Sequence, residues 1–194
     1  MRIFQTLKIT LLTILILVII IPINSYSDIS KAFPDMSNVF ENVSFYDKNN
    51  QITKFNGYEN KVLLVFFGYT HCPDVCPTTV LDMARVMKGL GAQSTQVLPM
   101  FISVDYERDD YKKVREYVDF FDNRIAALTS NKENIDALTK FFKTKYEFVE
   151  PKNKGYIVEH SSNIYILDKK LQVKKIIPNG IPSTEITRIV KKFL

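Results

Sequence analysis

The 194-residue sequence contains no tryptophan, only two cysteines and two histidines, and neither an internal repeat nor a low-complexity tract. It also lacks a stripe of basic side chains. Stretches such as "YKKVREYVDFFD" mix both signs, so the net charge of +5 indicates a solvated surface and no nucleic-acid partner. The hydrophobic content of 46% excludes a chain that is disordered on composition, and the part of the chain after the N-terminal segment has the length of one globular domain.

The N-terminus has the pattern of an export signal. Arg2 and Lys8 are its only charged residues before Asp28, and an apolar run extends from Ile9 to Ile23. Counted from Phe4, the run approaches the roughly 20 residues that cross a bilayer. We therefore predict an uncleaved membrane anchor in preference to a cleaved signal peptide, with a buried core helix as the remaining alternative. The basic end would stay in the cytoplasm or matrix, and the rest would lie on the far side.

The chain accordingly divides into a signal-anchor or signal peptide at 1–27, a linker at 28–40 and one domain at 41–194. Within the domain, strand-like and helix-like patterns alternate, which calls for crossover connections and a central sheet covered on both faces. A late hairpin makes this sheet mixed, so we expect an α/β fold. The expected strands are 61–70, 97–105 and 124–129, with hairpins at 42–55 and 162–177; the expected helices start at 77, 109, 131 and 183, and the third extends to 146.

The two cysteines, Cys72 and Cys76, lie close together in "GYTHCPDVCPTT", where the strand at 61–70 gives way to a helix. A structural disulfide is the weakest interpretation, because so short a loop removes little entropy from the unfolded chain and strains the bridge. Unpaired N–H groups at a helix N-terminus stabilise a thiolate, so these sulfurs should be reactive. Three intervening residues, one more than in the usual dithiol oxidoreductase motif, widen the pair enough to hold a metal ion.

A metal held by two thiolates needs a further ligand, and the chain offers only His71 and His160. His71 adjoins Cys72, so its side chain should point away from the sulfur and serve the local structure. His160 lies before a strand at a loop position where binding residues gather, and the residues alone leave it open between a structural and a metal-binding role. Two thiolates and one imidazole suit Cu(I) and also hold Cu(II), whereas structural zinc would need His71 as a fourth ligand.

Three segments together resemble the Sco/SenC family of copper-delivery proteins: "KVLLVFFGYTHCPDVCP", "FISVDYERD" and "VEHSSNIYILD". The likeness covers nearly everything after the N-terminal apolar run. It implies a thioredoxin-like fold tethered by one N-terminal helix, and copper bound through Cys72, Cys76 and His160. It further implies delivery of copper to the dinuclear copper centre of cytochrome c oxidase, by a monomer or weak dimer that is not an enzyme.

The same resemblance places the protein at a bacterial inner membrane facing the periplasm, or at a mitochondrial inner membrane facing the intermembrane space. The alternative function is a thiol-disulfide oxidoreductase that reduces the oxidase cysteines before metallation; nothing beside Cys72 supports a peroxidase. The sequence departs from the family at Tyr106, where members commonly have Pro, and at Glu159, where they have Asp. The family pattern gives Asp105 a role near the metal, with a strand-end cap as an equal alternative.

Overall fold

The computed structural model describes residues 29–34, 38–150 and 155–194. Its centre is a five-stranded sheet in the order β5-β4-β3-β8-β9. The first three strands are parallel, and β8 and β9 are antiparallel to their neighbours, so the predicted mixed α/β sheet is confirmed. The strands are β3 (Val62–Gly68), β4 (Val97–Ser103), β5 (Ala126–Leu128), β8 (Ile164–Leu167) and β9 (Val173–Ile177).

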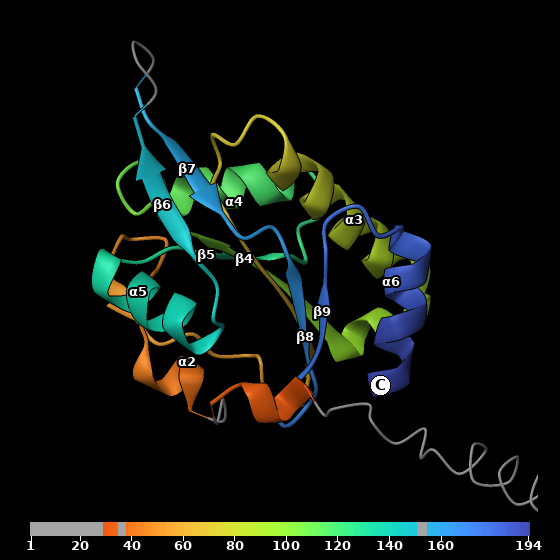
Figure 1. Cartoon of the computed structure of the whole chain (residues 1–194). Coiled ribbons are helices and arrows are strands. Elements are labelled where there is room, and N and C mark those ends of the chain that lie inside the picture. The colour runs from red at the N-terminus through yellow and green to blue at the C-terminus, as the bar shows by residue number, and fades with distance from the viewer. Residues whose placement is uncertain (1–28, 35–37, 151–154) are drawn as a thin grey trace, which may run out of the picture.

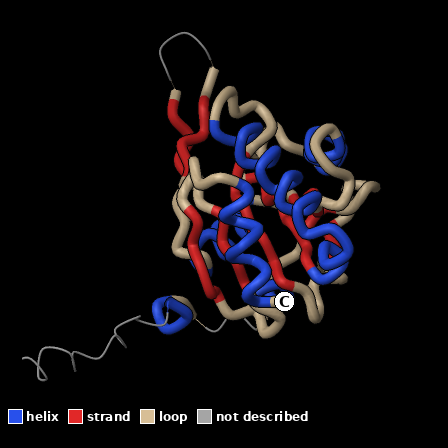
Figure 2. The backbone as a smooth tube through the Cα atoms, turned by 90° about the vertical axis from the view of Figure 1, so that its right-hand side faces the viewer, coloured by secondary structure: helices blue, strands red, loops and turns tan. Residues whose placement is uncertain are grey.

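Helices cover both faces of this sheet, as Figure 1 shows. The two helices α3 (Val75–Leu90) and α6 (Ser183–Val190) pack against each other on one side, and α5 (Lys132–Phe141) lies with α2 (Val39–Asn42) on the other. Viewed from the right-hand side of Figure 1, helices lie in front of the strands (Figure 2). All seven residues of β3 are buried, because this central strand has a partner strand on each edge and side chains over each face.

The remaining elements lie around the sheet. Asn50, with φ of 60°, turns the short hairpin at the place where the sequence predicts it. A second hairpin, β6 with β7, projects beyond the sheet (Figure 1) and carries His160 as the last residue of its second strand. The elements not yet given are η1 (Ile29–Ala32), β1 (Phe45–Tyr46), β2 (Ile52–Thr53), η2 (Gly91–Gln96), α4 (Tyr111–Asp119), β6 (Tyr146–Val149), β7 (Ile157–His160) and η3 (Lys191–Phe193).

Of the boundaries that differ from those predicted, two bear on the metal centre. The helix expected to reach residue 146 ends at Phe141, because Lys143 adopts a left-handed φ of 50° that no helix continues through, and Tyr146 starts a strand. At the other helix, α3 begins at Val75 instead of Pro77. Pro77 still fits in the first turn, where its missing N–H has no intrahelical partner to lose. Cys76 therefore belongs to the helix itself.

The predicted N-terminal anchor and linker lie wholly or partly outside the described residues. The apolar run from Ile9 to Ile23 is among the residues that the structure does not describe, and no described helix is both long and apolar enough to span a bilayer. Within the predicted linker, Val39 and Phe40 are already buried in the hydrophobic core. The anchor and the boundaries at 27 and 40 stay predictions.

Candidate metal centre

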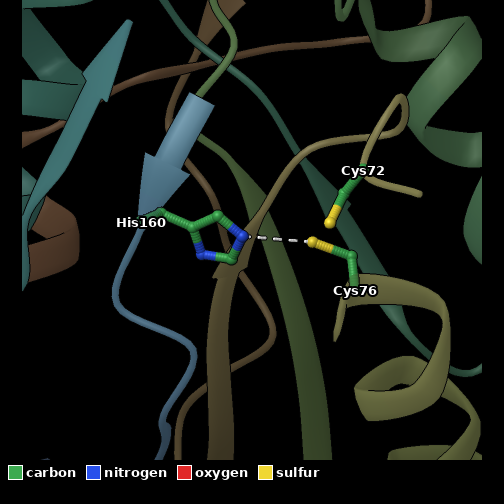
Figure 3. A group of neighbouring side chains, drawn as sticks. All are labelled: Cys72, Cys76 and His160. Carbon is green, nitrogen blue, oxygen red and sulfur yellow. Dashed lines mark hydrogen bonds between the residues drawn. The ribbon is translucent and has the colours of Figure 1, made fainter. Parts of the chain in front are cut away.

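Three chemically suited side chains from three separate elements meet at one end of β3 (Figure 3). Cys72 comes from the loop after β3, Cys76 from the first turn of α3, and His160 from the end of β7. The two sulfurs and a ring nitrogen of His160 all lie within 4.8 Å of one another. Both cysteines are free thiols, and the Cys76 sulfur lies 3.3 Å from Nε2 of His160. The structure thus brings together all three residues that the sequence analysis singled out.

The two sulfurs differ in exposure. Cys76 is fully buried, because its helix packs its first turn against the end of β3, whereas Cys72 is half-buried in the preceding loop. That loop bends back through a hydrogen bond from the backbone N–H of Cys72 to the carbonyl of Tyr69. An ion held between these sulfurs would have protein on one side and an approachable ligand on the other.

His160 is oriented by its strand and by two aromatic rings. It pairs with Tyr146 across the β6–β7 hairpin, and its ring meets the edges of Phe66 and Tyr69 at centroid distances of 6.0 and 5.8 Å. Its Nδ1 lies 3.2 Å from the carbonyl oxygen of Ser161. A carbonyl only accepts hydrogen bonds, so a proton on Nδ1 would be directed at Ser161, and the Nε2 lone pair would then be available to a metal ion between the sulfurs. The sequence analysis expected a loop position; the residue ends a strand instead.

The sulfurs influence each other's protonation. The thiol of Cys76 donates a hydrogen bond to the sulfur of Cys72, which lowers the pKa of Cys72, and His160 and the backbone N–H groups of Asp74 and Cys76 lower it further. The pKa of Cys76 is raised by the same hydrogen bond and by burial. The first proton therefore leaves the more exposed sulfur, and the pair starts as one thiolate and one thiol.

A buried carboxylate, Asp109, holds the loop before the cysteines. It accepts hydrogen bonds from the backbone N–H of Thr70 at 2.8 Å, from the Thr70 hydroxyl at 2.6 Å and from the Ser103 hydroxyl at 2.6 Å. Sequence reasoning missed this residue, and only its position in the turn between β4 and α4 offered a signal. His71 is exposed, and its Nδ1 lies 3.7 Å from Asp109, outside the group of possible ligands, in agreement with the local role expected for it.

Asp105 acts on the hairpin that carries His160. It is fully buried and accepts hydrogen bonds from Nε and the backbone N–H of Arg108 and from the hydroxyl of Tyr156. The guanidinium of Arg108 stacks 3.7 Å from the centroid of the Tyr156 ring and donates to the Tyr156 carbonyl. These contacts make Asp105 both the cap of the turn after β4 and an anchor for the approach to β7. It contributes no atom to the ligand group.

Of the two departures from the family pattern, Tyr106 packs against this hairpin from the turn after β4, and Glu159 lies on β7. The ring of Tyr106 contacts Phe148 at 5.1 Å and Tyr146 at 6.3 Å, so it packs beneath β6. Glu159 is exposed and pairs opposite Glu147. Neither residue belongs to the ligand group.

Comparison with known proteins identifies the family. The family model described as SCO1/SenC matches residues 33–194, which is most of the chain. The chain belongs to the SCO1/SenC family. As a family member it is 31% identical over 147 residues to a SCO2-like protein of Rickettsia prowazekii, covering 75% of this chain and 72% of that one. It is 37% identical over 111 residues to the SenC protein of Rhodobacter capsulatus, covering 57% and 50% of the two chains.

Solved structures agree with this family assignment. The copper-bound ScoI structure from Bradyrhizobium japonicum matches with a TM-score of 0.70 and 28% identity, over 78% of this chain and 97% of that one. The copper-bound ScoI structure from Arabidopsis thaliana has the same TM-score and identity, over 77% and 94%. The thioredoxin-like fold implied by the resemblance is therefore supported for the domain, while the anchor helix falls outside the comparison of described residues.

Proposed function

We propose that this protein is a membrane-anchored copper chaperone that binds one copper ion through Cys72, Cys76 and His160. One observation carries the proposal: two sulfurs and an imidazole nitrogen converge within 4.8 Å, with Nε2 facing the sulfurs. Two soft thiolates and one imidazole favour copper, in either oxidation state. Structural zinc would want a fourth protein ligand, and among the described residues no other Cys, His, Asp or Glu joins the group. Copper-bound relatives at 28% identity support the same metal.

The recipient we propose is the copper-bearing subunit of cytochrome c oxidase, with its dinuclear copper centre. Transfer would proceed by ligand exchange, in which thiolates of the partner replace the ligands one at a time and copper is never released free. The half-buried sulfur of Cys72 is the natural first point of exchange, because the buried Cys76 can keep the ion while the partner approaches. The protein would act as a monomer or weak dimer and not as an enzyme. We place it at a bacterial inner or mitochondrial inner membrane, facing away from the cytoplasm or matrix.

A second function is favoured by the low pKa of Cys72 and its nearness to Cys76. As a dithiol reductase, the Cys72 thiolate would attack one sulfur of a partner disulfide and expel the other as a thiolate. Cys76 would then lose its proton and attack Cys72, which releases the partner's second thiol and leaves a Cys72–Cys76 disulfide. Two electrons pass to the partner. This chemistry needs both cysteines but has no need of His160.

Replacement of the histidine separates the two functions. A strain that carries His160→Ala should fail to assemble its oxidase when copper is scarce, as should strains with Cys72→Ser or Cys76→Ser. The matched control is His71→Ala, which removes the chain's other histidine and should leave assembly intact. Purified His160→Ala protein should still exchange disulfides. Normal oxidase assembly in the His160→Ala strain, together with failure in the cysteine variants, would reject copper delivery and favour the reductase.

A further inference from the structure

A cleft beside the first described residues differs in character from the metal centre. It has a volume of about 760 Å³ and is lined by Lys31, Ala32, Phe33, Pro34, Ala137, Lys140, Phe141 and Lys143. None of the three candidate metal ligands lines it. Its walls combine two aromatic rings with three lysines, and no acidic residue is among the lining residues that the structure describes. The cleft is thus apolar within and positive at its rim.

The lysines of this cleft have few protein partners. Neither Lys31 nor Lys140 has an ion pair in the described part of the chain, and Lys143 lies over the ring of Phe33 with its Nζ 5.9 Å from the centroid. By contrast, Lys132, at the start of the helix α5 that carries Lys140 near its end, pairs with Asp136 at 2.6 Å. Positive charge gathered around half-buried rings, with no acid among the described lining residues, calls for a partner that is anionic and partly apolar.

The position of the cleft, close in sequence to the N-terminal apolar run, indicates what this partner is. Lys31 follows the end of the apolar run at Ile23 by eight residues, which span at most about 28 Å when fully extended. If the run is anchored in a bilayer, the cleft is tethered within reach of the headgroup layer. Phospholipids supply headgroup phosphates for lysines and acyl chains for aromatic rings, and basic clusters held close to a membrane are attracted to anionic lipids.

We propose that this cleft docks the domain onto the membrane by binding the headgroup of an anionic phospholipid. The inference rests on the membrane anchoring proposed above and is independent of the metal. Docking would fix which face of the domain is turned to the membrane, and so restrict the directions from which a partner can reach the sulfur of Cys72. Each lysine near an anionic surface should favour the docked state about fivefold, and the three together about a hundredfold.

The lack of tryptophan makes the docking measurable. Full-length chain carrying Phe141→Trp is reconstituted into lipid nanodiscs that contain brominated phosphatidylcholine, with or without phosphatidylglycerol. We expect bromine to quench the emission, and to quench it more strongly when the anionic lipid is present and salt is low. The matched reporter is Phe120→Trp, at an 85% exposed position outside the cleft, and its emission should not respond to the anionic lipid. Equal responses from the two reporters would overturn the proposal.

Charge variants test the recognition. In the Phe141→Trp background, the triple change Lys31→Gln, Lys140→Gln and Lys143→Gln should abolish the response to anionic lipid. An equal loss with three exposed lysines outside the cleft changed to glutamine, namely Lys48, Lys88 and Lys112, would show a mere effect of net charge and overturn the proposal.

Two further outcomes are distinguishable. Inorganic phosphate added to zwitterionic discs should change nothing; a shift as large as that caused by the anionic lipid would reassign the cleft to a free anion. Chain that migrates with the discs but ignores headgroup charge would overturn docking and leave anchoring intact. Chain that elutes apart from discs of both compositions would overturn both. Copper binding, measured on the same samples, should be unchanged in the lysine variants.

Discussion

Gly68 lies directly against Cys76, so that a Cβ atom on Gly68 would be 2.9 Å from the Cys76 sulfur. The same Cβ would lie 2.9 Å from the ring of Phe66 and 3.0 Å from the ring of Phe101. Carbon and sulfur atoms do not approach so closely without displacement. The absent side chain at the end of β3 is therefore what allows the buried sulfur to face the site while the strand stays packed.

A methyl group at this position should disturb the metal site. We expect Gly68→Ala to lower the free energy of unfolding by about 1–3 kcal/mol, as overpacking of a full core does, and to weaken copper binding by pushing Cys76 away from His160. The control is Gly89→Ala, whose Cβ would have the side chain of Thr187 as its nearest contact, at 3.1 Å, far from the sulfurs. Urea unfolding and copper competition with a chelator measure the two effects. Unaltered copper affinity in Gly68→Ala would contradict the steric argument.

The buried carboxylate of Asp109 should matter more than its neighbour Asp110. Asp109→Asn replaces one acceptor oxygen by a donor that faces the donors of Thr70 and Ser103, which should cost about 1.5–3 kcal/mol of stability and loosen the cysteine loop. Asp110 caps α4 by accepting from the backbone N–H of Lys113, and asparagine caps equally well, so Asp110→Asn should change stability little. Thermal unfolding of both variants, without metal, compares them. Equal stability would show that the carboxylate does not hold the loop.

Local patterns predicted most of the sheet. The seven buried residues of β3 form a continuous apolar run, and the helical spacing after it reaches the observed end of α3 at Leu90. The β6–β7 hairpin was not predicted, because the aromatic residues after α5 continue an apolar pattern that fits a helix. What ends that helix is a left-handed Lys143, and lysine has no marked preference for that conformation. The pairing of β6 with β7 takes its place, and because it joins residues that are not neighbours in the sequence, local patterns do not display it.

The metal centre, like the fold, was predicted from the sequence only in part. The spacing of Cys72 and Cys76 predicts a reactive pair, because both lie at one helix N-terminus. His160 is 84 residues away from Cys76, and only the fold brings them together, so the residues alone left its role open. Gly68 and Asp109 were missed because their roles depend on contacts across the sheet, which no spacing in the sequence displays.

The lowered pKa of Cys72 predicts its reactivity. An acid whose pKa is depressed by the fold is deprotonated at a lower pH in the folded chain than in the unfolded one. In the metal-free, reduced protein, the rate of alkylation of Cys72 by iodoacetamide should therefore reach half its maximum well below the usual thiol value of about 8.5. Buried Cys76 should react far more slowly. Mass spectrometry of each site against pH measures both, and the urea-unfolded chain is the control. Equal midpoints in folded and unfolded chain would contradict the hydrogen-bonded thiolate.

The final prediction concerns Arg108, which connects the turn after β4 to the strand that ends in His160. Its guanidinium pairs with buried Asp105, donates to the carbonyl of Tyr156 at 3.0 Å and stacks on the Tyr156 ring. Arg108→Lys keeps the charge but loses the planar fork and most of the stacking. We expect the free energy of unfolding to fall by about 1–3 kcal/mol, because the buried carboxylate of Asp105 loses part of its pairing.

The loss of stability in Arg108→Lys should be confined to the β6–β7 hairpin. Amide hydrogens of β6 and β7 should exchange faster in Arg108→Lys, while those of α6 keep their protection, since α6 packs on α3 away from this turn. Copper should also dissociate faster, because the strand that positions His160 is less firmly held. Arg115→Lys is the matched control: Arg115 pairs with Asp119 along the helix α4 and does not contact the hairpin strands through any described hydrogen bond or ion pair. A uniform increase in exchange, or an unchanged copper off-rate, would mean that Arg108 stabilises the fold without positioning the imidazole.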